Sequence, residues 1–335
     1  MTRAAVFGTG NWGTAFAMVL AEAGTETVLY GRRQELVDRI NRTHENTDYL
    51  PGVELPKELR ATADPRDALE GAEFLVLAIP AQHLRGSLSD WAPMAAPDTV
   101  FVSLMKGVEL GTCMRMSEVI AQVAGVGQER IAVVTGPNLA AEIVTRLPGA
   151  AAAVACADGG VAERLQHACH CAYFRPYTNT DVIGCELGGA VKNVIALAAG
   201  IAEGMGLGDN AKASLITRGL AETTRLGVAL GADPYTFAGL AGLGDLVATC
   251  SSLLSRNHRF GVFLGEGRTV EQAQAEVRQT TEGVKSCSSI QQLARRVGVE
   301  MPIVDTVVGV VHDGRSPREM LAGLLARSAK SEALY

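Results

Sequence analysis

Several features that mark specialised classes of protein are scarce in this chain. Aromatic residues occupy only 5% of the 335 positions and charged residues 20%, whereas 47% are hydrophobic. A chain so poor in charge and so rich in apolar side chains is expected to be globular with a well-filled core. Positive charge is not in excess, because 36 acidic residues outnumber 30 basic ones and the net charge is -6. No basic run reverses that balance, so we expect no binding to nucleic acid.

Long hydrophobic runs and paired cysteines are missing as well. The start, Met1-Thr2-Arg3, lacks the apolar region of a signal peptide, and later apolar runs are interrupted by glycine or charge. We therefore expect a cytoplasmic protein without a membrane-spanning segment. The 7 cysteines, an odd number, suit reduced core residues. The cluster His167, Cys169, His170 and Cys171 has no matching ligand pair elsewhere, so no metal is expected.

The sequence changes character near Gly184–Asn193, and this change predicts two domains. Upstream, short β-branched runs alternate with helical patterns and turn residues, whereas downstream one helical pattern follows another. We expect an α/β domain with a Rossmann-like, doubly wound parallel sheet over residues 1–181, and an all-α domain over residues 182–335. The length of 335 residues is ample for both.

A glycine-rich turn follows the first expected strand, Ala4–Phe7, and precedes a helical pattern. In such a unit Gly8 permits the tight turn, Gly10 lets the backbone approach a pyrophosphate, and Gly13 lets the helix pack on the strand. The first amides of the helix are suited to anionic oxygens. The pattern predicts dinucleotide binding, and a glycine turn that binds nothing is the alternative.

The end of the second expected strand, Thr27–Tyr30, bears on the choice of cofactor. NAD-selective folds place Asp or Glu there, whereas this chain has Gly31, Arg32 and Arg33. Two guanidinium groups suit a 2′-phosphate, so we favour NADP(H), with NAD(H) also used. The alternative is that both arginines are merely solvated at a helix start. The next segment, Glu45–Lys57, is an irregular excursion that could fold over the cofactor.

Two further loops follow buried strands, at the edge where open α/β sheets bind their ligands. Lys106 comes directly after the strand pattern Val100–Leu104, and Gly136 and Asn138 follow Ile131–Thr135. Their location favours a binding role, and the helix that begins after Asn138 could present its first amides to cofactor or substrate.

Lys192 is the leading catalytic candidate of the helical half. Val191, Val194 and Ile195 recur around it at helical spacing, which predicts that this lysine lies in the first turns of a buried helix. The structural alternative is a lysine whose stem packs while its ammonium reaches water. The neighbouring pair Gly188-Gly189 permits close approach of another backbone or of a ligand.

Two polar sites later in the chain stand apart from ordinary capping signals. Asp245 is a single acid among the apolar residues of 242–250, where a helix N-cap is the alternative. Ser255, Arg256 and Asn257 form a cluster rich in hydrogen-bond donors suited to phosphate.

Taken together, these motifs lie in an order that resembles one enzyme family. They are GTGNWG at 8–13, LMKG at 104–107, TGPNLAAEI at 135–143, GGAVKNV at 188–194, GLGDLVATC at 242–250 and SRN at 255–257. The series is similar to that of bacterial NAD(P)-dependent glycerol-3-phosphate dehydrogenases and spans nearly the whole chain. The resemblance implies a homodimer that reversibly reduces a small triose phosphate, dihydroxyacetone phosphate, to sn-glycerol 3-phosphate for glycerophospholipid synthesis.

The resemblance also implies a role for each matching residue. Lys192 is the general acid and base, and repulsion from Lys106 eases release of its proton. The implied substrate site consists of Lys106, Gly136, Asn138, Lys192, Asp245, Thr249, Ser255, Arg256 and Asn257. The implied cofactor site consists of Gly8, Gly10, Asn11, Trp12, Gly13, Arg32, Arg33, Lys106, Ala140, Arg256 and Glu282. Many relatives carry a hydroxyl residue where Asn11 and Asn138 stand.

Two other interpretations stay open. The β-hydroxyacid and 6-phosphogluconate dehydrogenases also use a helical lysine, but their asparagine follows several residues later, whereas here Asn193 is adjacent to Lys192. The other interpretation is a non-catalytic sensor that binds NADPH, although such a protein does not need Lys106, Lys192 and Asp245 together. Turnover of a triose phosphate discriminates between a sensor and an enzyme.

Overall fold

The computed structural model describes residues 2–277 and 280–325, which divide into two compact units. The first unit consists of Met1–Met105 and Met116–Val182, and the second of Lys106–Arg115 and Ile183–Tyr335. The short segment 106–115 thus belongs with helices that come much later in the chain. Positions 1, 278–279 and 326–335 of the two expected domains lie outside the described residues.

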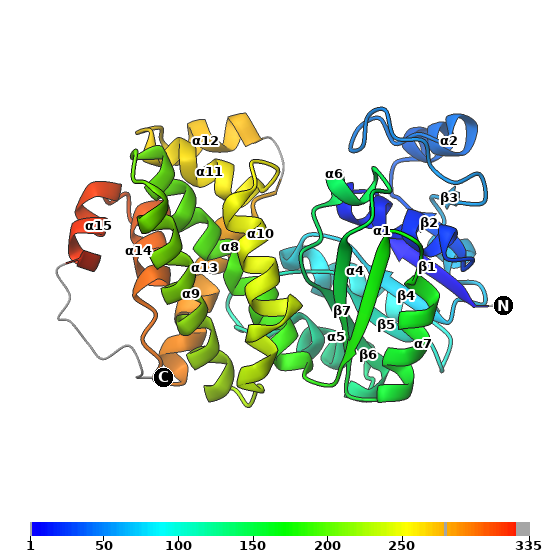
Figure 1. The fold of residues 1–335 in the computed structure, drawn as a ribbon. Coiled ribbons are helices and arrows are strands. Elements are labelled where there is room, and N and C mark those ends of the chain that lie inside the picture. Colours follow the sequence, from blue (N-terminus) through cyan, green and yellow to red (C-terminus); the bar gives the residue numbers. More distant parts are fainter. Residues whose placement is uncertain (1, 278–279, 326–335) are drawn as a thin grey trace. The chain divides into compact units, whose positions relative to one another are not determined.

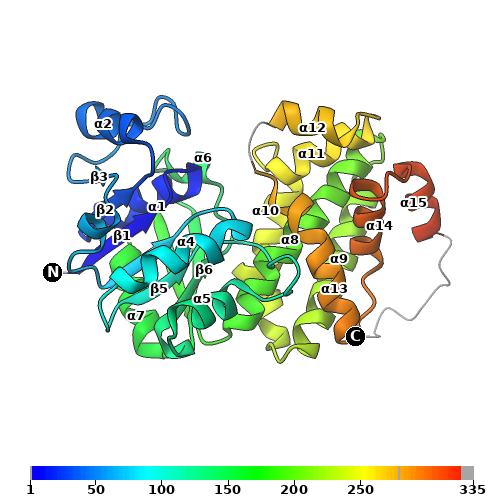
Figure 2. The same cartoon turned by 180° about the vertical axis from the view of Figure 1, so that it is seen from behind.

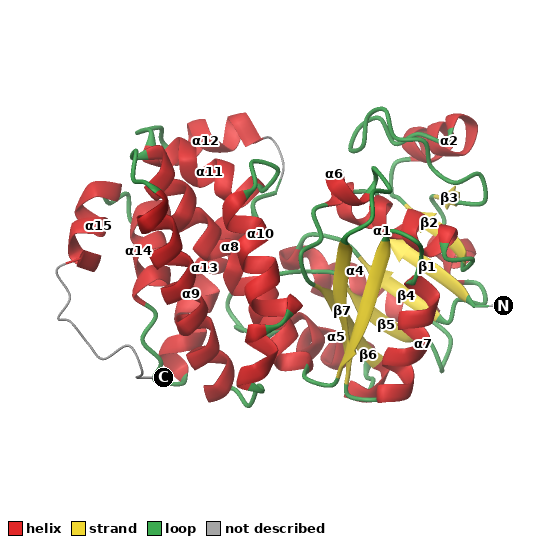
Figure 3. Cartoon of the chain, viewed as in Figure 1, coloured by secondary structure: helices red, strands yellow, loops and turns green. Residues whose placement is uncertain are grey.

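Every strand that the structure describes belongs to the first unit (Figure 3). The 8 strands form one sheet in the order β3-β2-β1-β4-β5-β6-β7-β8. They are β1 (Arg3–Phe7), β2 (Glu26–Tyr30), β3 (Arg60–Thr62), β4 (Phe74–Leu77), β5 (Val100–Ser103), β6 (Ile131–Thr135), β7 (Ala150–Cys156) and β8 (Phe174–Asn179). Because β2 and β3 extend to one side of β1 and the later strands to the other, the expected doubly wound sheet is confirmed.

The sheet departs from the expectation in two places. β6 and β7 pair antiparallel whereas β7 and β8 pair parallel, so β7 and β8 run opposite to the other six strands of the expected parallel sheet. Their connection contains only α6 (Ala140–Ile143), a helix of 4 residues, whereas a parallel crossover uses a full helix. β3 was not foreseen, because a strand of 3 residues is too short to show a periodic pattern.

Helices cover both faces of this sheet. On one face α1, α6 and α7 pack together, with α7 along β7 and β8 (Figure 1). On the other face α4 and α5 lie side by side (Figure 2). The helices not yet given bounds are α1 (Asn11–Glu22), α2 (Gln34–Thr43), α3 (Pro65–Leu69), α4 (Leu84–Trp91), α5 (Met116–Ala124) and α7 (Gly159–Cys169). Burial from both sides explains why β4 and β5 read as continuous apolar runs.

Apart from an isolated antiparallel bridge between Val108 and Arg115, the described secondary structure of the second unit is helical (Figure 3). Its helices are α8 (Val182–Gly204), α9 (Asp209–Ala229), α10 (Asp245–Ser251), α11 (Arg256–Gly265), α12 (Val270–Val277), α13 (Glu282–Arg296), α14 (Pro302–Val311) and α15 (Pro317–Leu325). A 3-10 turn, Pro234–Ala238, and a π-helical turn, Leu240–Gly244, precede α10.

α8, the helix that contains the catalytic candidate Lys192, is buried along most of its length. Leu187, Val191 and Val194 are completely buried. The helix has 23 residues and begins at Val182, so Lys192 lies in its middle turns and the expectation of the first turns was wrong. Gly188 lies inside the helix, where a Cβ atom would be 2.4 Å from the backbone oxygen of Ala241, so a close backbone contact requires glycine there.

One helix among the described residues has the length and composition of a membrane span. It is α8, with a mean hydropathy of 1.5, although the sequence analysis expected no such run because it counted glycines as interruptions. Of its apolar window, 94% is buried inside the protein. A packed core helix satisfies the same criteria of length and composition.

Each unit has its own hydrophobic core. In the first unit Phe16 and Phe74 are fully buried between sheet and helices. In the second unit Phe237 and Phe260 are buried among the helices. Burying such a side chain contributes about 1.5–3 kcal/mol, so each unit holds its own part of the candidate site on a packed frame.

Candidate functional site

The glycine-rich turn follows β1, at the point where the strand order reverses. Gly8 has a φ of 129°, a region that side chains rarely adopt. A Cβ atom on Gly13 would lie 2.0 Å from the backbone oxygen of Gly8, so α1 can approach the turn this closely only with glycine there. Nothing lies within 4 Å of the Cβ position of Gly10. The amides at the start of α1 therefore open onto space that a pyrophosphate can enter.

Asn11 and Trp12 open α1, and both contact neighbouring segments. The side-chain amide of Asn11 donates to the backbone oxygen of Tyr49 at 2.9 Å. The ring of Trp12 packs against Phe16 and Phe174, with centroid distances of 5.5 and 6.5 Å. Its buried Nε1 has no hydrogen-bond partner within the described residues, so this donor fits an acceptor on a ligand.

Arg32 and Arg33 precede α2, and both are exposed. Nη2 of Arg33 lies 2.7 Å from Oδ2 of Asp48, and its guanidinium carbon lies 5.9 Å from the ring centroid of Tyr49. Arg32 makes no ion pair with any residue in 2–277 or 280–325. Asp48 was not predicted from the sequence, because no local pattern shows where the irregular segment after α2 turns back.

Gly136, Asn138 and Ala140 lie between β6 and the start of α6, also in the first unit. Gly136 has a φ of 135°, which favours glycine. Both polar atoms of the buried Asn138 amide lack a hydrogen-bond partner in the part of the chain that the structure describes. Because an unsatisfied buried amide is costly, Asn138 fits a ligand that offers both a donor and an acceptor.

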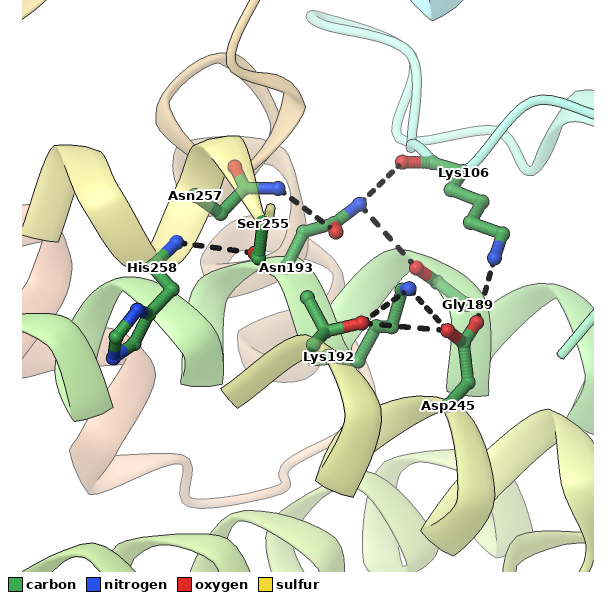
Figure 4. A network of polar contacts seen from close by, with 9 residues as sticks. Lys106, Gly189, Lys192, Asn193, Asp245, Ser255, Asn257 and His258 are labelled. Atoms are coloured by element: carbon green, nitrogen blue, oxygen red, sulfur yellow. Dashed lines mark hydrogen bonds and ion pairs between the residues drawn. The ribbon is translucent and has the colours of Figure 1, made fainter. Parts of the chain in front are cut away.

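In the second unit, Asp245 links two lysines (Figure 4). Nζ of Lys106 donates to Oδ2 of Asp245 at 2.6 Å, and Nζ of Lys192 donates to Oδ1. Lys192 also donates to the hydroxyl of Thr249 at 2.6 Å. Asp245 is 1% exposed and Lys192 7%. The carboxylate is therefore held between two ammonium groups almost completely out of water.

Burial lowers the pKa of Lys192 to about 7. Loss of hydration is the largest cause, attraction to Asp245 opposes it, and repulsion from Lys106 adds to it. A lowered pKa of Lys192 was expected from repulsion by Lys106, which is a smaller cause than burial. An amine with a pKa near neutrality can both give and take a proton in the physiological range.

The backbone around Asp245 explains how this acid reaches α8. A Cβ atom on Gly188 would lie 2.4 Å from the backbone oxygen of Ala241, so α8 and the turn Leu240–Gly244 meet backbone to backbone. Asp245 is the first residue of α10, and Thr249 follows one turn later on the same face. Gly244 and not Asp245 is the N-cap of α10, so the alternative of a helix N-cap was wrong, and the side chain of Asp245 pairs with the lysines instead.

A chain of amides joins three helices beside the lysine pair. Nδ2 of Asn193 donates to the backbone oxygen of Lys106 at 3.3 Å, and Nδ2 of Asn257 donates to Oδ1 of Asn193 at 2.9 Å (Figure 4). The backbone amide of Gly283 donates to Oδ1 of Asn257 at 2.9 Å. These bonds fix the backbone at Lys106 and the starts of α11 and α13 to α8. No signal in the sequence indicated this role for Asn193.

The remaining expected residues surround the start of α11. Ser255 is its N-cap, with a hydroxyl that accepts from the backbone amide of His258 at 3.2 Å. Arg256 is exposed, and Glu282 opens α13 beside the Gly283 amide that binds α11. Of the expected substrate residues, the structure brings into direct contact Lys106, Lys192, Asp245 and Thr249.

The cysteines and histidines form no comparable centre. All 7 cysteines are free thiols. Burial raises the pKa of Cys169, so its thiol stays protonated at neutral pH. Within residues 2–277 and 280–325, no set of three or more His, Cys, Asp or Glu side chains comes together as metal ligands.

Comparison with known proteins gives matches to both halves of the chain. Residues 3–162 match the family described as NAD-dependent glycerol-3-phosphate dehydrogenase N-terminus. Residues 181–322 match the family described as NAD-dependent glycerol-3-phosphate dehydrogenase C-terminus.

Individual proteins resemble the chain over nearly its whole length. A glycerol-3-phosphate dehydrogenase (NAD(P)+) of Streptomyces coelicolor is 69% identical over 330 residues, 98% of each chain. One from Thermobifida fusca is 63% identical over 333 residues, 99% of each chain. The crystal structure of glycerol-3-phosphate dehydrogenase from Coxiella burnetii, 37% identical, superposes with a TM-score of 0.92 over 97% of this chain and 99% of that one.

Proposed function

Since this chain belongs to the NAD-dependent glycerol-3-phosphate dehydrogenase family, we infer that it is an NAD(P)-dependent oxidoreductase that reversibly reduces dihydroxyacetone phosphate to sn-glycerol 3-phosphate. The observation that best supports this function is the buried Lys192, which donates hydrogen bonds to Asp245 and Thr249. The product is the backbone of glycerophospholipids, so the enzyme supplies phospholipid synthesis.

Lys192 is the proposed general acid and base. A bound reduced nicotinamide supplies a hydride to the carbonyl carbon of the substrate. The ammonium of Lys192 then gives its proton to the oxygen as the C=O double bond becomes a C–O single bond, which leaves a neutral amine and an alcohol. In the oxidation the neutral amine takes the hydroxyl proton. The pKa of about 7 keeps both forms of Lys192 available.

Asp245 and Lys106 position this proton donor. Asp245 fixes the Lys192 ammonium by a direct bond and balances the charge of two buried lysines. The side chain of Lys106 is 15% exposed, so of the two lysines it is the one that a substrate entering from solvent can contact more easily. Ser255 and Asn257 are proposed to hold substrate oxygens and Arg256 to reach the phosphate region, and Gly136 and Asn138 are proposed to approach the substrate.

The residues of the first unit fit a dinucleotide cofactor. The open space at Gly10 and the unpaired Nε1 of Trp12 support pyrophosphate and ribose binding at the start of α1. We propose that Arg32 and Arg33 favour NADP(H) over NAD(H), because guanidinium groups at the end of β2 suit a 2′-phosphate. Ala140 and Glu282 are proposed as further cofactor contacts.

The cellular location and the oligomeric state of the enzyme belong to the same proposal. A small phosphorylated substrate and a net charge of -6 are consistent with a cytoplasmic enzyme that does not bind nucleic acid. We propose a homodimer, as the family resemblance implies.

The first experiment is an absorbance assay on the purified protein. We expect loss of NADPH, and more slowly of NADH, when dihydroxyacetone phosphate is added, and little loss with unphosphorylated ketones or with β-keto acids. Oxidation driven by a β-keto acid would favour the β-hydroxyacid dehydrogenase alternative. Protein that binds NADPH but oxidises it with none of these ketones would be a sensor, and the proposed function would fail.

A further inference from the structure

The irregular segment after α2 is built into the dinucleotide end of the first unit. Asn46 is completely buried, and its amide nitrogen donates to the backbone oxygen of Thr9 at 2.9 Å and to the hydroxyl of Thr14 at 2.8 Å. Here the glycine-rich turn also supplies a donor, because the side-chain amide of Asn11 donates to the backbone oxygen of Tyr49 at 2.9 Å. Residues 46–49 are therefore fastened to the glycine-rich turn on both sides.

Asp48 projects from this fastened segment and pairs with two arginines. Its Oδ2 lies 2.7 Å from Nη2 of Arg33, and its Oδ1 lies 2.8 Å from Nη1 of Arg39. Arg39 also donates to the hydroxyl of Thr47 at 2.8 Å, which fixes the second pair to the segment. These bonds, chiefly the one from Arg33, hold the pKa of Asp48 below its ordinary value, so the carboxylate stays charged at neutral pH.

Arg33 is fixed by these contacts without being covered. Only one of its terminal nitrogens pairs with Asp48, its guanidinium lies over the ring of Tyr49, and its side chain is 55% exposed. Arginine loses much rotamer freedom when it is held in one orientation. Here the protein has restricted that freedom before a ligand arrives, while other N–H donors of the same planar group remain open to solvent.

We propose that Asp48 is a specificity-determining residue, which holds the Arg33 guanidinium over Tyr49 in the orientation that receives the 2′-phosphate of NADP(H). This inference rests on the proposed function, because it assumes that the turn after β1 binds a dinucleotide. Asp48 is a positioning residue, since it acts through Arg33.

Asp48 differs from the acid that NAD-selective folds place at the end of β2. That acid accepts hydrogen bonds from the ribose hydroxyls, whereas both oxygens of Asp48 are already engaged by guanidinium groups. Two arginines, Arg33 and Arg39, pair with this one carboxylate, so the three side chains together carry a net positive charge. A positive surface with one prearranged guanidinium suits a phosphate monoester better than a neutral diol.

Substitution of Asp48 tests the inference through binding of both nucleotides. Calorimetry with NADPH and with NADH would be run on the full chain and on Asp48→Asn, without any triose phosphate. We expect NADPH to bind about 2- to 10-fold more weakly, the range expected when one such side chain must be ordered on binding, and NADH affinity to stay unchanged. Asp48→Glu, which keeps the charge, should recover part of the NADPH affinity.

A matched control and a second background separate this role from general effects. Asp67 forms a comparable ion pair with Arg60, at 2.6 and 3.0 Å, and Asp67→Asn should change neither affinity. In an Arg33→Ala background, Asp48→Asn should have no further effect on the ratio of NADPH to NADH affinity, because Asp48 acts through Arg33.

Several results would overturn the inference. They are an unchanged affinity ratio in Asp48→Asn, tighter NADPH binding, an equal loss for both nucleotides, and the same effect with Arg33 absent. The assay of turnover is separate, so a protein inactive on dihydroxyacetone phosphate that still showed the expected ratios would end the proposed function and leave this inference intact.

Discussion

At the scale of single residues, the chemistry depends on one lysine kept out of water. Lys192 is 7% exposed, and its pKa of about 7 results mainly from lost hydration. Asp245 alone would raise that pKa, and Lys106 brings it down again. The group is therefore a better acid than an exposed lysine and remains anchored by Asp245 and Thr249 in the right place.

This pKa predicts opposite pH dependences for the two directions of reaction. Reduction needs the ammonium, so kcat/KM for dihydroxyacetone phosphate should fall as the pH rises through about 7, whereas oxidation needs the neutral amine and should rise over the same range. Steady-state assays from pH 5.5 to 9 would test this. Parallel profiles in both directions would contradict the role of Lys192.

Removal of the lysine should act on turnover and not on nucleotide binding. Lys192→Ala should lower kcat by roughly 10²- to 10⁴-fold, the usual contribution of a positioned proton donor. NADPH affinity should stay close to that of the unaltered protein. Lys285→Ala, on the exposed face of α13, is the matched control and should leave both quantities unchanged. Normal turnover of Lys192→Ala would exclude the proposed mechanism.

At the scale of elements, α8 and α11 are brought together by glycines on both helices. A Cβ atom on Gly200 would lie 2.1 Å from the backbone oxygen of His258, and one on Gly261 would lie 2.2 Å from that of Leu197. Gly204 and Gly265 repeat the arrangement one turn later. This close crossing allows the bond between the side chains of Asn193 and Asn257, which starts the amide chain beside the lysines.

A methyl group in this crossing should separate the two helices. Gly200→Ala is expected to lower the unfolding free energy by about 1–3 kcal/mol, because the contacting atoms belong to the backbone and cannot rotate away. The melting temperature and kcat/KM should both fall, since Asn193 and Asn257 move apart. Gly86→Ala, inside α4, where nothing lies within 4 Å of the added carbon, is the control. Equal melting temperatures for both variants would contradict this account.

At the scale of the whole molecule, the free energy of unfolding should depend on pH through a buried acid, Glu222, which is not part of the candidate site. Glu222 is 4% exposed and accepts from the backbone amide of Ile303, at 3.0 and 3.2 Å, at the start of α14. Burial raises its pKa from 4.5 to about 7. The protonated Glu222 carboxyl contributes fully to the free energy of unfolding below about pH 4.5, where it is protonated in both the folded and the unfolded state. This contribution is lost as the pH rises through about 7.

Glu222→Gln should remove this dependence. The melting temperature of the variant minus that of the unaltered protein should increase from pH 5 to pH 8, because only the natural side chain must ionise in a buried position. The full effect is of the order of 3 kcal/mol for the shift in pKa. Glu276→Gln, on an exposed side chain, should give a constant difference. A constant difference for Glu222→Gln as well would show that the carboxyl is hydrated in the folded state.

The sequence by itself determined the features that depend on neighbours along the chain. The turn at Gly8–Gly13, the order of the longer strands and helices, the helical second half and the candidate Lys192 all follow from local spacing and residue type. These patterns suffice because helix and strand periodicity, and the φ that Gly8 needs, are properties of a few consecutive residues.

Only the tertiary structure decided how distant segments meet. It reversed the direction of β7 and β8, placed Lys192 in the middle of α8, buried it to lower its pKa, and brought Asp245 and Asp48 to their basic partners. Each outcome depends on packing between segments that are not neighbours along the chain, as where Gly188 meets the backbone of Ala241. No local pattern encodes such a contact, because its energy exists only once both segments are folded against each other.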